Sequence, residues 1–339
     1  MDKGCSGQGQ LTPSRPARVA LENNLAAEHY AALQLAMSRM LSTFLATETF
    51  AQIVDGLPTR DIYLDYYNSL RPDFEENLVS SQPAMDAVES YQKKFDISCL
   101  QVDTNIVQAY QNASRGSKEF NLRLMEILAV LCHEIAVYLY NTYDGGLRKP
   151  NSAEVYHQMP KPSVLPLGKS QPMRLKPAEL FHPYYQDWQQ YPHGKADIVG
   201  YWAEYRLFGG VVLFDRGQTG SECKDMFIHP VGDYNIFQLS DKQIENYMSF
   251  LFLEQTHNLS TSPKAPEHMR FKAEKHARRI EPYDAIVYLN IYRDKYERKI
   301  PERRPRRCVV WAEDVMPDYR EALLDLAERT ERMRTQRKE

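Results

Sequence analysis

A histidine and a glutamate, two residue types common in catalytic and binding sites, are adjacent in the apolar segment LAVLCHEIAVYLYNTYDGG. They are His133 and Glu134, and a pair of glycines at 145 and 146 ends the segment. Polar and charged side chains are rare inside an apolar helix unless a partner or a bound group holds them. The segment therefore predicts either a functional site or a buried polar cluster.

A third candidate residue follows on another predicted helix, Glu204 in GYWAEYRLFGG, and a short strand is predicted before the first helix, over residues 97–102. In this outline the chain resembles the thermolysin-like branch of the zincins, where an HExxH helix and a later glutamate bind zinc. The resemblance implies a zincin-like core with His133 and Glu204 as metal ligands, zinc as the cofactor, and Glu134 as the catalytic general base. Over residues 95–215 the chain is also similar to fungal proteins of unknown function that carry an HEI helix and a WE..LFGG segment.

The HExxH motif is degenerate in this chain, because the position four residues after His133 is Val137. Valine cannot bind a metal, so His133 and Glu204 supply two ligands where a catalytic zinc normally has three and a water. His229, in FIHP, could supply a third. We therefore predict a protein that binds a peptide or small molecule without classical peptidase activity. The alternatives are a zinc-dependent hydrolase that uses these residues, and a structural or interaction protein.

The structural alternative follows from the helix geometry. Residues seven apart nearly eclipse on a helix, so one narrow arc holds Glu126, His133, Val137 and Tyr140. Glu134 lies about 80° to 100° from that arc. In this interpretation the arc is a polar stripe, Glu134 pairs with Arg206 or accepts hydrogen bonds from tyrosines, and His133 donates to a backbone carbonyl.

Periodicity and capping residues predict the elements that would position these side chains. A helical stripe of Leu33, Met37, Met40 and Phe44 ends at Gly56. A long helix is predicted from Ser117 to about Tyr143, with Ser117 as its cap, and a second helix from 196 to 208. Strands are predicted over 211–214 and 234–240, and Ser240 with Gln243 predicts a capping box for the helix that follows.

Composition places these elements in one α+β domain, mainly helical with a small sheet. The chain has 339 residues and a formal net charge of −3, and its five cysteines never form a CxxC pair. We expect an intracellular, soluble, cytoplasmic protein, with the nucleus left open, and no membrane partner. The predicted organisation is a disordered leader at 1–16, a single domain at 17–315 with a proline-rich loop or lid at 147–195, and a basic C-terminal helix or arm at 316–339.

Two further segments have both a functional and a structural interpretation. The basic run at 293–307 is expected to be a solvated arm or a contact for an acidic protein surface, in preference to nucleic acid. The aromatic residues of 181–202 could line a ligand pocket or simply pack the loop against the core. Cys132 points about 100° away from its neighbour His133, so it is predicted to be a core residue.

Overall fold

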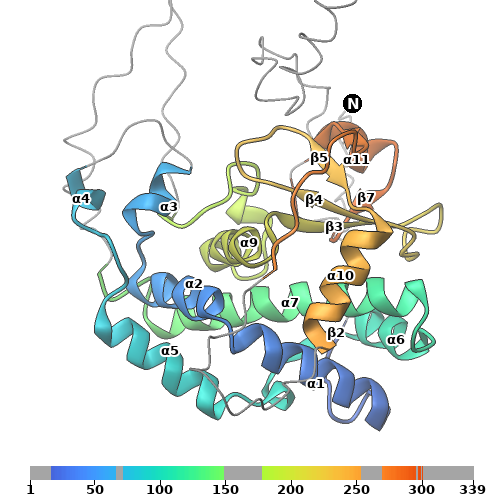
Figure 1. Ribbon diagram of the computed structural model, residues 1–339, viewed down its shortest axis with the longest axis horizontal. Helices are drawn as coiled ribbons and strands as arrows, with labels where there is room; N and C mark the ends of the chain where they lie inside the picture. The colour runs from blue at the N-terminus through green and yellow to red at the C-terminus, as the bar shows by residue number, and fades with distance from the viewer. Residues whose placement is uncertain are drawn as a thin grey trace, which may run out of the picture.

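The fold of the chain mixes helices with antiparallel strands (Figure 1). The computed structural model describes residues 17–65, 72–148, 178–252, 269–294, 297–298 and 300. The predicted leader at 1–16, most of the loop at 147–195 and the predicted arm at 316–339 lie outside these ranges. The domain boundaries therefore stay predictions.

The first half of the chain is helical apart from one strand pair. The helices are α1 (Ala27–Leu41), α2 (Phe44–Asp55), α3 (Arg60–Leu64), α4 (Pro72–Glu75), α5 (Gln82–Lys94), α6 (Thr104–Asn112) and α7 (Lys118–Thr142). Strand β1 (Arg18–Ala20) pairs antiparallel with β2 (Gln101–Asp103), and a 3₁₀ turn, η1 (Ile97–Cys99), precedes β2.

The second half supplies a five-stranded sheet and the remaining helices. Its elements are η2 (Trp188–Gln190), α9 (Lys195–Phe208), β3 (Val211–Asp215), β4 (Met226–His229), β5 (Ile236–Gln238), α10 (Asp241–Phe252), β6 (Arg279–Ile280), α11 (Pro282–Val287) and β7 (Ile291–Tyr292). The strand order is β6-β5-β4-β3-β7, and every neighbouring pair is antiparallel. The edge strand β7 pairs with β3, so the residues that follow β7 lie close to β3.

Both faces of this sheet are buried, which explains why β3 is apolar at successive positions. Val212 and Phe214 face the main core with α7 and α9, whereas Val211 and Leu213 belong to a second core on the opposite face. In Figure 1, α9 lies between the sheet and α7. Helices α1, α2 and α5 lie on the side of the fold away from the sheet. The two helices predicted to carry the candidate site therefore pack against each other at the centre of the fold.

Several sequence predictions are confirmed at the capping residues. The Ser117 hydroxyl accepts a hydrogen bond from the backbone of Phe120 at the start of α7, and Gly209 ends α9 with φ +92°. The backbone of Gln243 donates to the Ser240 hydroxyl at 3.3 Å, and its side chain accepts from the Ser240 backbone at 3.1 Å. These contacts form the predicted capping box.

Two predicted elements are wrong in part. The stripe from Leu33 to Phe44 does not lie on one helix, because α1 ends at Leu41 and α2 begins at Phe44. Phe44 is not a core residue, since 65% of its surface is exposed. The strand predicted over 97–102 begins as a 3₁₀ turn, since the Asp96 carboxylate caps it by accepting from the backbone of Ser98. Only Gln101–Asp103 form a strand.

Candidate functional site

His133 is held between two carboxylates of α9. Its Nδ1 lies 2.8 Å from Glu204 Oε1 and its Nε2 lies 3.1 Å from Asp197 Oδ1. Asp197 and Glu204 are seven residues apart, so they share one face of α9 about two turns apart, and the imidazole of His133 spans the gap. All three side chains are buried.

The close approach of α7 to α9 depends on Gly200, which lies on the same face of α9 between the two carboxylates. A Cβ atom at this position would lie 2.4 Å from Nε2 of His133. Tyr201 meets the same imidazole edge to face, with ring centroids 4.7 Å apart. The imidazole of His133 is therefore held by packing against Gly200 and Tyr201 as well as by its hydrogen bonds.

The charges of this cluster are arranged to keep His133 protonated. Burial opposes protonation, but the hydrogen bonds to Asp197 and Glu204 and the charge of Glu204 raise the pKa of His133 to about 9. In the imidazolium form both ring nitrogens donate. Burial likewise opposes ionisation of Glu204, yet the guanidinium of Arg293 and the hydrogen bond from His133 lower the pKa of that carboxyl.

Arg293 enters the cluster from the end of β7 and pairs with Glu204 through Nη1. Its guanidinium also lies over the ring of Tyr201, 5.2 Å from the centroid. This residue opens the basic run for which a solvated arm was predicted. That interpretation is wrong for the side chains of Arg293, Glu297 and Arg298, which are buried, whereas Asp294 and Ile300 are exposed.

Glu134 points away from this cluster, as its helix position requires. Its Oε1 lies 2.6 Å from Nη2 of Arg18 in β1, and its Oε2 lies 3.9 Å from Nε2 of His193. The predicted pairing with Arg206 is wrong, because the Arg206 guanidinium lies 3.7 Å from the Glu48 carboxylate and 3.9 Å from that of Asp65. The catalytic role of Glu134 stays a prediction.

His229, the predicted third ligand, lies in a different cluster on β4. Its Nδ1 is 3.2 Å from the hydroxyl of Tyr185, its ring stacks on Tyr184, and its backbone carbonyl accepts from Nε2 of His182. Burial and the neighbouring His182 lower the pKa of His229 well below its usual value, so this imidazole is neutral. His133 and Glu204 are thus brought together, whereas His229 sits among tyrosines.

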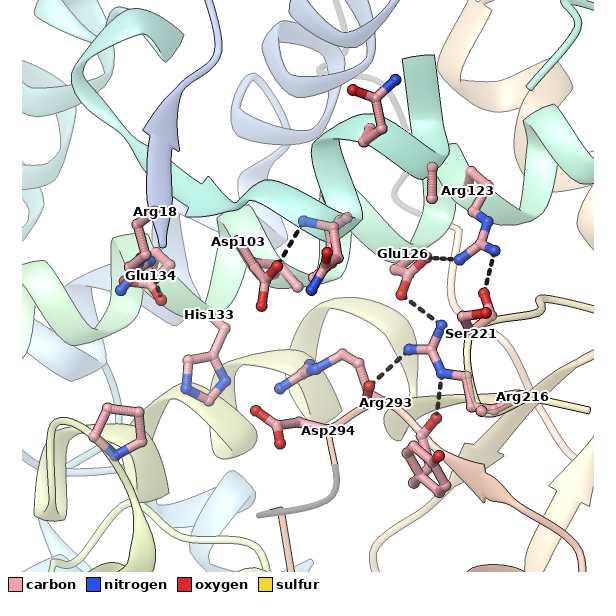
Figure 2. Close-up of a pocket in the computed structure, with 18 of the residues that line it drawn as sticks. Arg18, Asp103, Arg123, Glu126, His133, Glu134, Arg216, Ser221, Arg293 and Asp294 are labelled. Atoms are coloured by element: carbon pink, nitrogen blue, oxygen red, sulfur yellow. Dashed lines mark hydrogen bonds and ion pairs between the residues drawn. The ribbon is translucent and has the colours of Figure 1, made fainter. Parts of the chain in front are cut away.

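A cleft of about 1050 Å³ opens over His133 and Glu134 (Figure 2). Its floor and walls come from β1, β2, α6, α7, α9, β7 and neighbouring loops, and they include Glu126 and His133 of the polar stripe predicted on α7. At the end away from His133, the Glu126 carboxylate pairs with Arg123 at 2.9 Å and with Arg216 at 2.7 Å. The two guanidinium groups also donate to backbone carbonyls, so they are rigidly held.

The aromatic segment at 181–202 divides between the two predicted roles. All four of Phe181, Tyr185, Tyr191 and Tyr201 belong to the second core, and Tyr191 and Tyr201 also line the cleft. Cys132 is buried in the main core, as predicted.

Sequence reasoning missed Asp197, Gly200 and Arg293. The first two carry a detectable signal, because both share a helix face with Glu204 in DIVGYWAE. Arg293 carries no such signal, since its contact with Glu204 joins residues 89 positions apart.

The donor set does not fit a zinc ion in the arrangement that the side chains adopt. Both nitrogens of His133 are in hydrogen bonds to carboxylates, and a protonated imidazole has no lone pair for a metal. Within the described ranges, no group of three or more His, Cys, Asp or Glu side chains is placed to hold a metal ion. In the same part of the chain, no helix is long and apolar enough to cross a membrane.

Comparison with known proteins adds no relative to this description. No protein-family model, no curated protein and no solved structure matches the chain.

Proposed function

We propose that this protein binds a peptide or a small polar molecule in the cleft over His133 and does not turn it over. The observation that carries the proposal is the cleft itself, whose charged floor is pre-organised by ion pairs between buried side chains. A volume of about 1050 Å³ is at the upper end of the range of small-molecule sites. Rigid polar groups in a concave, partly apolar site favour specific binding, because little side-chain entropy is lost when the ligand arrives.

In this proposal the chain has a zincin-like core that no longer binds a metal. In support, His133 and Glu204 lie on two packed helices and are joined by a direct hydrogen bond, which in this proposal takes the place of a shared ion. Because Asp197 holds the opposite nitrogen, a metal would have to displace at least one of these hydrogen bonds. Val137 adds an apolar group where the motif has its second histidine.

A zinc-dependent hydrolase is the second candidate, and one distance favours it. Nδ1 of His133 and Oε1 of Glu204 are 2.8 Å apart, not far from the separation of about 3.3 Å expected for two ligands of one tetrahedral zinc. In that case His133 and Glu204 would hold the metal, and Glu134 would have to turn from Arg18 to act as the base.

Metal analysis separates the two candidates. Protein purified without chelator and supplied with equimolar zinc should carry well below one equivalent after dialysis, and His133→Ala should leave that content unchanged. A content near one equivalent that His133→Ala removes would overturn the binding proposal in favour of the hydrolase.

Ligand-observed NMR with a diverse set of polar fragments tests binding in the cleft directly. Ala109 lines the cleft on α6, so Ala109→Trp should fill it and abolish the signals of cleft ligands. The matched control is Ala27→Trp, at an exposed position at the start of α1. Fragments should remain unmodified after prolonged incubation. A fragment profile that is identical in both variants and the wild type would show that the cleft is not the binding site.

A further inference from the structure

Arg293 presents unused hydrogen-bond donors to the cleft. Its side chain is only 7% exposed, and its Nη1 is committed to Glu204. Within the described ranges, its Nε and Nη2 donate no hydrogen bond to a protein acceptor. In Figure 2 the guanidinium lies in the cleft beside His133. A planar, buried guanidinium with free donors is suited to receive a carboxylate, because it can donate two parallel hydrogen bonds.

Two carboxylates face the same space. Asp103 caps α6 by accepting from the backbone of Asn105 at 2.7 Å, and Asp294 follows Arg293 in the chain. Figure 2 shows Asp103 and Asp294 on opposite sides of the cleft, with the guanidinium of Arg293 close by. Partial burial and the negative charges of Asp294 and Glu126 raise the pKa of Asp103. Two acidic neighbours thus act on Asp103, and a cation beside its carboxylate would be stabilised.

We propose that the cleft recognises the head group of an α-amino acid, either free or at the end of a short peptide. The carboxylate of the ligand lies on the free donors of Arg293, and its ammonium group lies against the carboxylate of Asp103. This inference rests on the proposed function, since it names the ligand class of the same cleft.

A ligand with both charges fits better than one with either charge alone. A simple anion at Arg293 would face the carboxylates of Asp103 and Asp294, and a simple cation would face Arg293 and the protonated His133. The cleft is larger than the head group, and its remaining wall includes apolar groups of Ile106 and Val130. These residues are placed to contact the rest of the ligand.

Isothermal titration calorimetry with free amino acids and short unblocked peptides tests the inference. For a ligand that binds, acetylation of the α-amino group and amidation of the carboxylate should each lower affinity at least 10-fold, since each removes a charge-assisted interaction. Asp103→Asn should lower affinity for the unblocked ligand by about 10-fold and leave the weak binding of the acetylated form unchanged. Asparagine still caps a helix, so this change removes charge while keeping α6.

Asp96→Asn is the matched control, because Asp96 caps η1 in the same way but lies outside the cleft. It should leave every affinity at the wild-type value. Arg293→Lys keeps the positive charge next to Glu204 and removes the two-donor geometry, so it should weaken binding of the free acid more than that of the amide.

Equal affinity for free and blocked ligands would overturn the inference. So would failure of all amino acids and peptides to bind while polar fragments still occupy the cleft and Ala109→Trp expels them, and the proposed function would then stand. If neither class of probe binds in the cleft, both proposals are wrong.

Discussion

Gly200 and His133 are in such close contact that a side chain on one would occupy the space of the ring of the other. A Cβ at residue 200 would lie 2.4 Å from Nε2 of His133 and 2.5 Å from two of its carbons. Gly200 lies in the interior of α9, where glycine is normally unfavourable. Its absence of a side chain therefore has a specific use, which is to let the imidazole lie flat against α9 between Asp197 and Glu204.

Gly200→Ala is expected to destabilise the protein by about 1–3 kcal/mol, the usual cost of overpacking a tight contact. The sign is informative, because the same change in an ordinary helix interior is stabilising by about 1 kcal/mol. Urea denaturation of wild type and variant measures the difference.

The His133→Ala background provides the control for this substitution. With the ring removed, Gly200→Ala should be neutral or stabilising, so the double-mutant cycle should give a coupling free energy of more than about 1 kcal/mol. Additive effects of the two substitutions would contradict the contact.

The raised pKa of His133 makes stability depend on pH in the alkaline range. The pKa of His133 is about 9 in the folded protein and 6.5 for an ordinary histidine, so the stabilisation is fully present below about pH 6.5 and is lost as pH rises through 9. A shift of this size corresponds to about 3 kcal/mol of unfolding free energy. Denaturation curves at pH 6.5 and pH 9.5 should differ by an amount of this order.

His133→Gln isolates the contribution of this ring, because glutamine can still donate a hydrogen bond but does not titrate. The wild type should lose more stability than the variant between these two pH values. Equal losses in both proteins would assign the effect to other groups and refute the raised pKa of His133.

The sequence predicts the helices that carry the site much better than it predicts the site. The start of α7 at Ser117 and the end of α9 at Gly209 follow from local capping chemistry, so they are readable from neighbouring residues. The partner of Glu134 is not readable in this way, because Arg18 comes from a strand more than 100 positions earlier in the chain. Arg206, the nearer candidate in sequence, faces a different surface of α9.

The sheet shows the same division between local and tertiary information. β3 is recognisable as an apolar run after a helix end, whereas β4, its neighbour in the sheet, was seen only as the short motif FIHP around His229. Pairing between strands depends on contacts that a single sequence does not display. The α+β class was therefore predictable, while the order of the strands was not.

Cys99, Cys132 and Cys223, the cysteines within the described ranges, should differ sharply in reactivity in the native protein. Burial raises the pKa of the Cys223 thiol to about 12 and that of Cys132 above its usual range, whereas Cys99 is exposed. Because the thiolate is the reactive form, iodoacetamide at pH 8 should modify Cys99 and spare the other two.

Mass spectrometry of tryptic peptides, with and without denaturant during labelling, measures this difference. Cys132 and Cys223 should react only in denaturant. Rapid labelling of Cys132 in the native protein would show that the core around α7 opens readily, and it would contradict the burial of the helix that carries His133.

Two arginine-to-methionine substitutions should have different costs, although both side chains are buried. Arg293→Met leaves the fully buried carboxylate of Glu204 with His133 as its remaining charged partner, so it should destabilise the protein by about 3–5 kcal/mol. Arg206→Met leaves Glu48 and Asp65, whose side chains are 31% and 46% exposed and so accessible to solvent, and its cost should therefore be about 1 kcal/mol or less. Methionine keeps most of the apolar stem in both cases, so the comparison isolates the charge. Chemical denaturation of the two variants measures the costs, and a cost for Arg206→Met equal to that of Arg293→Met would refute the assignment of Arg293 as the principal cation of the His133 cluster.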